Sequence, residues 1–161
     1  MIMKATFLIP LLALLIACNA GNKPMTEAQK EAVRGEATLA IKDVFDVLAL
    51  GNGEKRMAMC ENSTDFSFTL ADGVFTYDGL KTYVKQALQG AEKESFNTKS
   101  EKYIVIDPAC FVYVWQGKID IYMKSGKILT FDDYFSTWTF RKSEGTWKMV
   151  NGHESYKVPV G

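Results

Sequence analysis

Apolar residues recur at helical spacing through the first half of the chain. Thr26 and Gln29 have the spacing of a capping box, which predicts that a first helix begins at residue 27 and runs to about residue 50. The apolar positions of this helix are Val33, Ala37, Ile41, Val44, Phe45 and Leu48. A shorter helix is predicted over 54–61, and a third over 79–90 with Asp78 as its N-cap. Between them, residues 65–70 and 74–77 alternate as two short strands around a turn.

After Gly90 the pattern changes to long segments rich in aromatic and β-branched residues. Strands are predicted over 96–106, 110–123, 127–142 and 146–156. The turns between them are short, so consecutive strands are expected to pair as antiparallel hairpins. Helices followed by an antiparallel sheet indicate an α+β fold, in which about three helices cover one face of a curved, mostly antiparallel sheet. The space between helices and sheet is the natural place for a pocket.

The amino terminus has the pattern of an export signal. Lys4 precedes an apolar run over 5–16 that is too short to cross a bilayer core of about 30 Å. The run ends in Leu15-Ile16-Ala17-Cys18, which resembles the lipobox of bacterial lipoproteins. The alternative is an ordinary signal or anchor with an incidental cysteine.

The lipoprotein resemblance implies cleavage before Cys18 and lipidation of that cysteine. The protein would then be held on a bacterial membrane, either facing the periplasm or in the outer membrane. Residues 1–17 are accordingly predicted to be the signal peptide, residues 18–26 the lipidated cysteine and a tether, and residues 27–161 one folded domain.

Charge and cysteine content remove several function classes. The 19 basic and 19 acidic side chains balance, so no electrostatic surface for nucleic acid is expected. Cys60 and Cys110 could form a disulfide in an exported protein, although two separately buried thiols are preferred. The only histidine is His153, so neither a metal site nor any other cofactor is predicted.

Two segments carry a resemblance to the nuclear-transport-factor-2-like superfamily. Residues 137–155 look like its closing hairpin, with Trp-x-x-Val-x-x-His-x-Ser after a Glu-Gly turn. Residues 107–115 are similar to a strand entry in the association domain of calcium/calmodulin-dependent kinase. The SnoaL-like branch is the other near resemblance. The resemblance to the superfamily implies a cone-shaped domain, in which a strongly bent sheet wraps over the first helix and leaves a pocket at the wide end.

The resemblance also suggests where a ligand would lie. Pocket arginines that receive carboxylates in the kinase association domain correspond to Trp115, Trp138 and Glu154, so carboxylate binding does not carry over. With Tyr113 and Tyr134, these residues predict an aromatic pocket with one acid, suited to a small apolar, aromatic or cationic ligand. The alternative is that the aromatic side chains only fill the core.

Enzymes of this superfamily use a pocket acid or base, as the resemblance implies. Asp132, Glu154 and His153 are the candidates here, with Asp133 and Tyr134 as further possibilities. Strand alternation places Asp132 on one face with Tyr134 and Trp138, whereas a bulge at Gly152 could move Glu154 or His153 to either face.

Three functions stay open at this level. The first is a membrane-anchored, periplasmic module that binds a small ligand. The second is a SnoaL-like lyase or isomerase with a pocket carboxylate as general base. No Asp/His or Asp/Tyr set in the sequence matches an isomerase motif residue by residue, so an enzyme is the less favoured interpretation. The third is an interaction domain that forms a homodimer through the outer face of its sheet.

Overall fold

A computed structural model describes residues 24–156 of the chain and begins with one long helix. Helix α1 spans Glu27–Leu48, and Thr26 caps it as the sequence predicts. The Gln29 amide donates to Thr26 Oγ1 at 3.2 Å, and the Thr26 amide donates to Gln29 Oε1 at 2.9 Å. Both contacts satisfy amides that a helix start leaves without partners. The predicted signal peptide and most of the tether lie outside the described residues.

Two short helices and a small hairpin follow. Helix α2 spans Gly53–Ala58, strands β1 and β2 span Ser67–Leu70 and Gly73–Phe75, and helix α3 spans Tyr77–Ala87. The predicted N-cap of the third helix is wrong. Thr76 caps α3 by accepting a hydrogen bond from the Gly79 amide at 3.3 Å, and Asp78 lies in the first turn.

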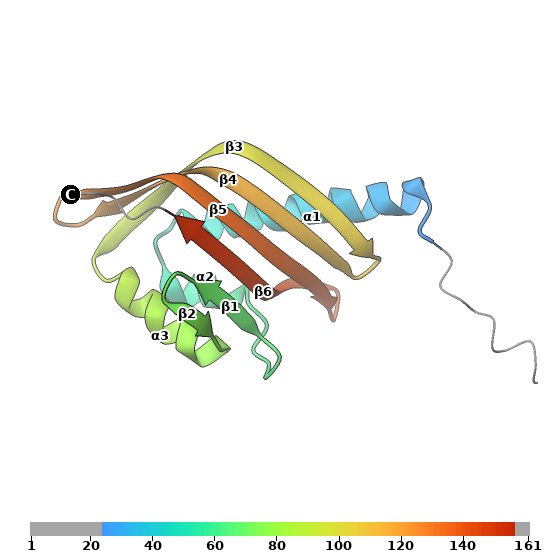
Figure 1. Ribbon diagram of the computed structural model, residues 1–161, viewed down its shortest axis with the longest axis horizontal. Coiled ribbons are helices and arrows are strands. Elements are labelled where there is room, and N and C mark those ends of the chain that lie inside the picture. The colour runs from blue at the N-terminus through green and yellow to red at the C-terminus, as the bar shows by residue number, and fades with distance from the viewer. Residues whose placement is uncertain (1–23, 157–161) are drawn as a thin grey trace, which may run out of the picture.

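Four long strands complete one sheet of six. They are β3 over Ala91–Asp107, β4 over Cys110–Met123, β5 over Ile128–Ser143 and β6 over Thr146–Tyr156. The strand order is β2-β1-β6-β5-β4-β3, and only β1 and β6 run parallel. The long strands bend over α1, while α2, α3 and the small hairpin lie at one end (Figure 1). The α+β prediction, with helices on a curved and mostly antiparallel sheet, is confirmed.

Among the bulges of the sheet, one on β5 and one on β6 decide which side chains of these two strands face α1, on the side called here the inner face. Gly117 pairs with Tyr134 and Ile119 pairs with Phe131, so β5 has one extra residue in the stretch between them. Thr139 pairs with Asn151 and Phe140 with Met149, so Val150 is an extra residue on β6. Each extra residue reverses the alternation of the strand beyond it.

The core lies between α1 and the inner face. Phe45 of α1 has its ring centroid within 5.2–6.2 Å of four aromatic rings from the sheet, which belong to Phe96, Tyr113, Trp115 and Trp138. Such tilted and edge-to-face arrangements suit the quadrupoles of aromatic rings. Within residues 24–156, no helix is both long and apolar enough to span a bilayer.

Candidate functional site

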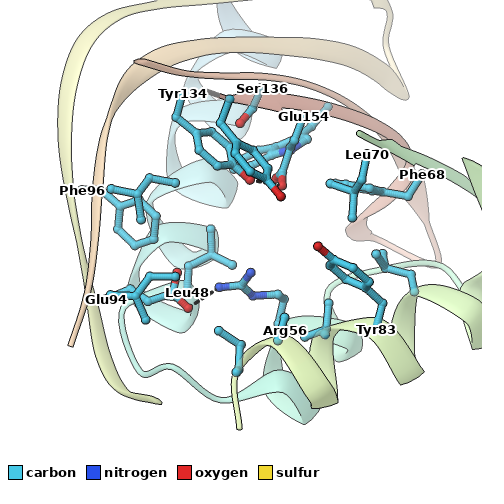
Figure 2. Close-up of a pocket in the computed structure, with 18 of the residues that line it drawn as sticks. Leu48, Arg56, Phe68, Leu70, Tyr83, Glu94, Phe96, Tyr134, Ser136 and Glu154 are labelled. Carbon is cyan, nitrogen blue, oxygen red and sulfur yellow. Dashed lines mark hydrogen bonds and ion pairs between the residues drawn. The ribbon is translucent and has the colours of Figure 1, made fainter. Parts of the chain in front are cut away.

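A cavity of about 190 Å³ lies between the inner face of the sheet and the helices. Most of its lining is apolar, and the large apolar side chains come from all three helices, β1 and every long strand. Polar groups gather on two opposite walls (Figure 2). One wall carries Tyr134, Ser136 and Glu154, and the other carries Arg56 and Glu94.

Glu154 is held by two donors on β5. Its Oε2 accepts a hydrogen bond from the Tyr134 hydroxyl, and its Oε1 accepts one from Trp138 Nε1 at 3.1 Å. Burial raises the pKa of the Glu154 carboxyl, although both donors and the nearby Arg56 charge oppose the change. Glu154 is therefore a carboxyl group with an increased affinity for a proton.

Tyr134 and Ser136 surround this carboxyl group. Burial, followed by the neighbouring Glu154 charge, raises the pKa of the Tyr134 phenol well above its ordinary value. Ser136 lies directly opposite Glu154 in the β5–β6 register and is only 1% exposed. Its Oγ has no hydrogen-bond partner among the described residues.

The opposite wall holds a buried ion pair. Arg56 Nη2 lies 2.5 Å from Glu94 Oε1, and the Glu94 side chain is 3% exposed. Burial raises the pKa of Glu94 against the opposing effect of Arg56. Tyr83 of α3 directs its hydroxyl into the cavity (Figure 2), and burial with the neighbouring Tyr156 raises the pKa of Tyr83 to about 12.

The structure places both predicted tryptophans in the cavity wall. Trp115 and Trp138 are buried, and Trp115 Nε1 donates to Thr98 Oγ1 at 2.8 Å. Tyr113 is buried too, but it is not among the cavity-lining residues. Its hydroxyl donates to Glu101 Oε2 at 2.6 Å and its ring packs under Phe45. Tyr113 therefore belongs to the packed core rather than to the cavity.

Asp132 and His153 lie away from the cavity. The bulge on β5 turns both Phe131 and Tyr134 inward, which leaves the Asp132 side chain 77% exposed near Lys118. His153 is exposed on the outer face, because the bulge on β6 lies at Val150 and not at Gly152. Asp133 forms an ion pair with Lys99 at 3.0 Å on the surface. Of the predicted acid and base candidates, Glu154 and Tyr134 line the cavity.

Sequence reasoning missed Arg56, Glu94, Ser136 and Tyr83 as cavity residues. Glu94 lies in the polar run Glu92-Lys93-Glu94-Ser95, where nothing distinguishes the buried acid from its exposed neighbours. Its partner Arg56 is 38 positions away in the chain. Ser136 could have been found, because it shares its strand face with Tyr134 and Trp138.

The cysteines and acids offer little to a metal ion. Cys60 and Cys110 are free thiols, and burial raises the pKa of Cys60 to about 12, so its thiolate is disfavoured. Residues 24–156 contain no group of three His, Cys, Asp or Glu side chains arranged to hold a metal.

The architecture is that of the nuclear-transport-factor-2-like fold. A superfamily protein from Salmonella enterica matches with a TM-score of 0.67 and 13% identity, over 82% of this chain and 96% of that one. A candidate association domain of calcium/calmodulin-dependent protein kinase II from Xanthomonas campestris matches with a TM-score of 0.62 and 20% identity. The match covers 78% of this chain and 88% of that one.

A candidate scytalone dehydratase from Novosphingobium aromaticivorans matches with a TM-score of 0.69 and 11% identity, over 83% of this chain and 89% of that one. Neither a protein-family model nor a curated protein sequence matches the chain. At these identities the likeness concerns the fold alone, and function has to be argued from the cavity.

Proposed function

We propose that this protein binds a small, largely apolar molecule of about one ring in its cavity. The observation that carries the proposal is the combination of an apolar space of about 190 Å³ with polar groups that converge on its walls. An engineered apolar cavity of about 150 Å³ is large enough to bind benzene. The space here therefore suits one substituted ring, with Trp115, Trp138 and Phe96 as apolar walls.

Nuclear magnetic resonance of the indole N–H groups tests this proposal. Toluene and phenol are titrated into the full chain labelled with ¹⁵N. We expect the Trp115 and Trp138 signals to shift in a saturable manner, because both rings line the cavity. Trp147 is an internal reference, since its Nε1 donates to Glu36 at 3.1 Å and it does not line the cavity.

A plugging variant controls for binding elsewhere. Ala87 is exposed at the cavity lining, so Ala87→Phe should block the space at little cost in folding. Ala32→Phe makes the same change at an exposed position of α1 outside the cavity lining. We expect Ala87→Phe alone to abolish the shifts. Equal shifts at all three indoles, or none with either probe, would contradict the proposal.

A lyase or isomerase activity is the second candidate, favoured by the raised pKa of Glu154 within a largely apolar cavity. A carboxylate with such a pKa can remove a proton from a carbon next to a carbonyl, and the Tyr134 phenol is placed to return one. The dehydratase named above shares only the fold. The test is deuterium exchange at the α-carbon of cyclohexanone in heavy water.

The matched variants for this test are Glu154→Gln, which keeps an acceptor for Trp138, and Glu92→Gln on the exposed side of the same sheet. Catalysis by Glu154 requires exchange to fall to the uncatalysed rate in Glu154→Gln alone. Exchange that is unchanged in Glu154→Gln, or no faster than in buffer, rejects this activity.

We also propose that the protein is a lipoprotein anchored through Cys18 to a bacterial membrane, facing the periplasm or in the outer membrane. The support is the lysine-led apolar run that ends in Leu-Ile-Ala-Cys. Cys18→Ser should move the protein from the membrane fraction to the soluble fraction, whereas Cys110→Ser should not. Retention of Cys18→Ser in the membrane fraction argues against lipidation.

A further inference from the structure

The Ser136 hydroxyl is a buried hydrogen-bonding group that the described residues leave unused. The residue is 1% exposed, it lines the cavity, and its Oγ has no partner among the described residues. A hydroxyl can donate one hydrogen bond and accept others, and leaving it unpaired when buried costs free energy. A ligand in the cavity could supply the missing partner.

Ser136 and Glu154 form one composite polar wall. They are direct cross-strand partners with both side chains on the inner face, so their Cβ atoms are about 4.5–5.5 Å apart. Glu154 accepts one hydrogen bond at each carboxyl oxygen, from Tyr134 and Trp138. A carboxylate oxygen can accept a second bond, so this wall presents a free donor beside a free acceptor.

Such a wall is complementary to a hydroxyl group on the ligand. We propose that the cavity binds a neutral molecule of about one ring whose hydroxyl group donates to Glu154 and accepts from Ser136. This inference rests on the proposed binding function and names the ligand class.

Charge supports a neutral ligand. A carboxylate on the ligand would lie against Glu154, and the opposite wall offers it only Arg56, which already pairs with Glu94 at 2.5 Å. A cation would lose its hydration in a cavity whose lining is mostly apolar, and Glu154 already accepts hydrogen bonds from Tyr134 and Trp138. The phenolic hydroxyl of a substituted ring meets neither obstacle.

Four single-ring probes test the inference on the unaltered full chain, and phenol and toluene among them have the same number of non-hydrogen atoms. The probes are phenol, toluene, benzoate and benzylamine, each titrated while the Trp138 indole N–H signal is observed. Trp138 donates to Glu154, so its signal reports directly on this wall. We expect phenol to bind about tenfold more tightly than toluene, as two modest hydrogen bonds would give, and more tightly than both charged probes.

Ser136→Ala then isolates the serine. It should weaken phenol binding about fivefold and leave toluene binding unchanged. Ser155→Ala is the matched control, because Ser155 is exposed on the same strand pair and opposite Phe135. The ¹⁵N spectrum of each variant shows whether it is folded, and the selectivity among the four probes needs no variant at all.

Each contrary outcome has a distinct meaning. Toluene that binds as tightly as phenol, or a Ser136→Ala variant that weakens both alike, overturns the hydroxyl inference and leaves the proposed binding function standing. Tighter binding of benzoate or benzylamine overturns it too, in favour of a charged ligand. If none of the four probes binds, the proposed binding function fails with it.

Discussion

Glu154 combines burial with two hydrogen-bond donors, and this combination makes it the most informative residue of the cavity. The Tyr134 hydroxyl and Trp138 Nε1 favour the ionised carboxylate, whereas burial favours the protonated form. Burial is the larger of these effects, so the pKa rises above its ordinary value of 4.5. The same shift that would suit proton transfer must then appear in the stability of the protein.

The pH dependence of unfolding tests this shift. A raised pKa means that the folded state binds the proton more tightly than the unfolded chain. The contribution of Glu154 to the free energy of unfolding is therefore largest at low pH. This contribution declines as the pH rises from about 4.5 to the pKa of Glu154 in the folded protein. Because glutamine does not titrate, Glu154→Gln should gain stability relative to the unaltered chain across this window.

Urea unfolding at about pH 4 and about pH 8 measures the difference. Glu92→Gln is the control, because it removes an acid from an exposed position of β3. A stability difference between Glu154→Gln and the unaltered chain that is the same at both pH values would falsify the raised pKa.

At the scale of the elements, the sequence predicts the helices and strands but not the bulges on β5 and β6. The hydrophobic pattern predicted every helix and strand in order, because periods of 3.6 and 2 follow from burial on one face. The family resemblance, not alternation, placed Trp115 and Trp138 at the pocket, and both side chains line the cavity. Asp132 was placed wrongly because the extra residue on β5 reverses that alternation, and no local sequence signal marks it.

Contacts between residues far apart in the sequence are the second feature that the sequence does not predict. The Arg56–Glu94 ion pair joins α2 to β3, and neither residue differs locally from exposed charged neighbours. A charged residue is seldom fully buried unless it is paired, so its burial depends on a partner that only the fold supplies. The cavity wall formed by Arg56 and Glu94 was therefore invisible to sequence reasoning.

Gly117 gives a prediction for strand β4. A Cβ atom there would lie 2.4 Å from the Trp115 ring and 2.4 Å from the Asn97 carbonyl oxygen of β3. Backbone cannot move aside without disturbing the β3–β4 pairing, so Gly117→Ala should lower the free energy of unfolding by about 1–3 kcal/mol or more. It should also displace the Trp115 indole from Thr98 and change the near-ultraviolet circular dichroism.

Gly35→Ala is the matched control. Gly35 lies within α1, where an added Cβ meets no atom within 4 Å. Alanine there should raise the free energy of unfolding by about 0.5–1 kcal/mol, since glycine is unfavourable in helices. Gly117→Ala as stable as the unaltered chain would mean that Trp115 is not packed over β4 in this way.

At the scale of the whole molecule, the outer face of the sheet is the surface without a covering layer (Figure 1). Its central rows are largely uncharged, and each row runs across the four long strands. One of these rows contains Ile104, Val112, Thr139 and Asn151. Another row, four residues further along β4, contains Ser100, Gln116, Phe135 and Ser155. Phe135 is 45% exposed, which is unusual for a large aromatic side chain on a strand.

We propose that a second copy of the chain covers this outer face in a homodimer. A stable interface buries about 800 Å² on each partner, which is within the reach of four strands of this length. The name of the Xanthomonas association domain is consistent with assembly but bears on that protein only. If Phe135 is central, its replacement by a charged residue should disrupt the dimer, because an unpaired buried charge is costly.

Phe135→Asp is therefore expected to convert a dimer to a monomer, as measured by light scattering after size-exclusion chromatography. Val74→Asp is the control, because the Val74 side chain is 74% exposed on β2, which is an edge strand outside the four long strands. This variant should leave the dimer intact. The Trp115 and Trp138 indole signals should stay in place in both variants, since the cavity opens on the inner face. A monomeric unaltered chain, or a dimer that survives Phe135→Asp, would show that the outer face does not join two copies.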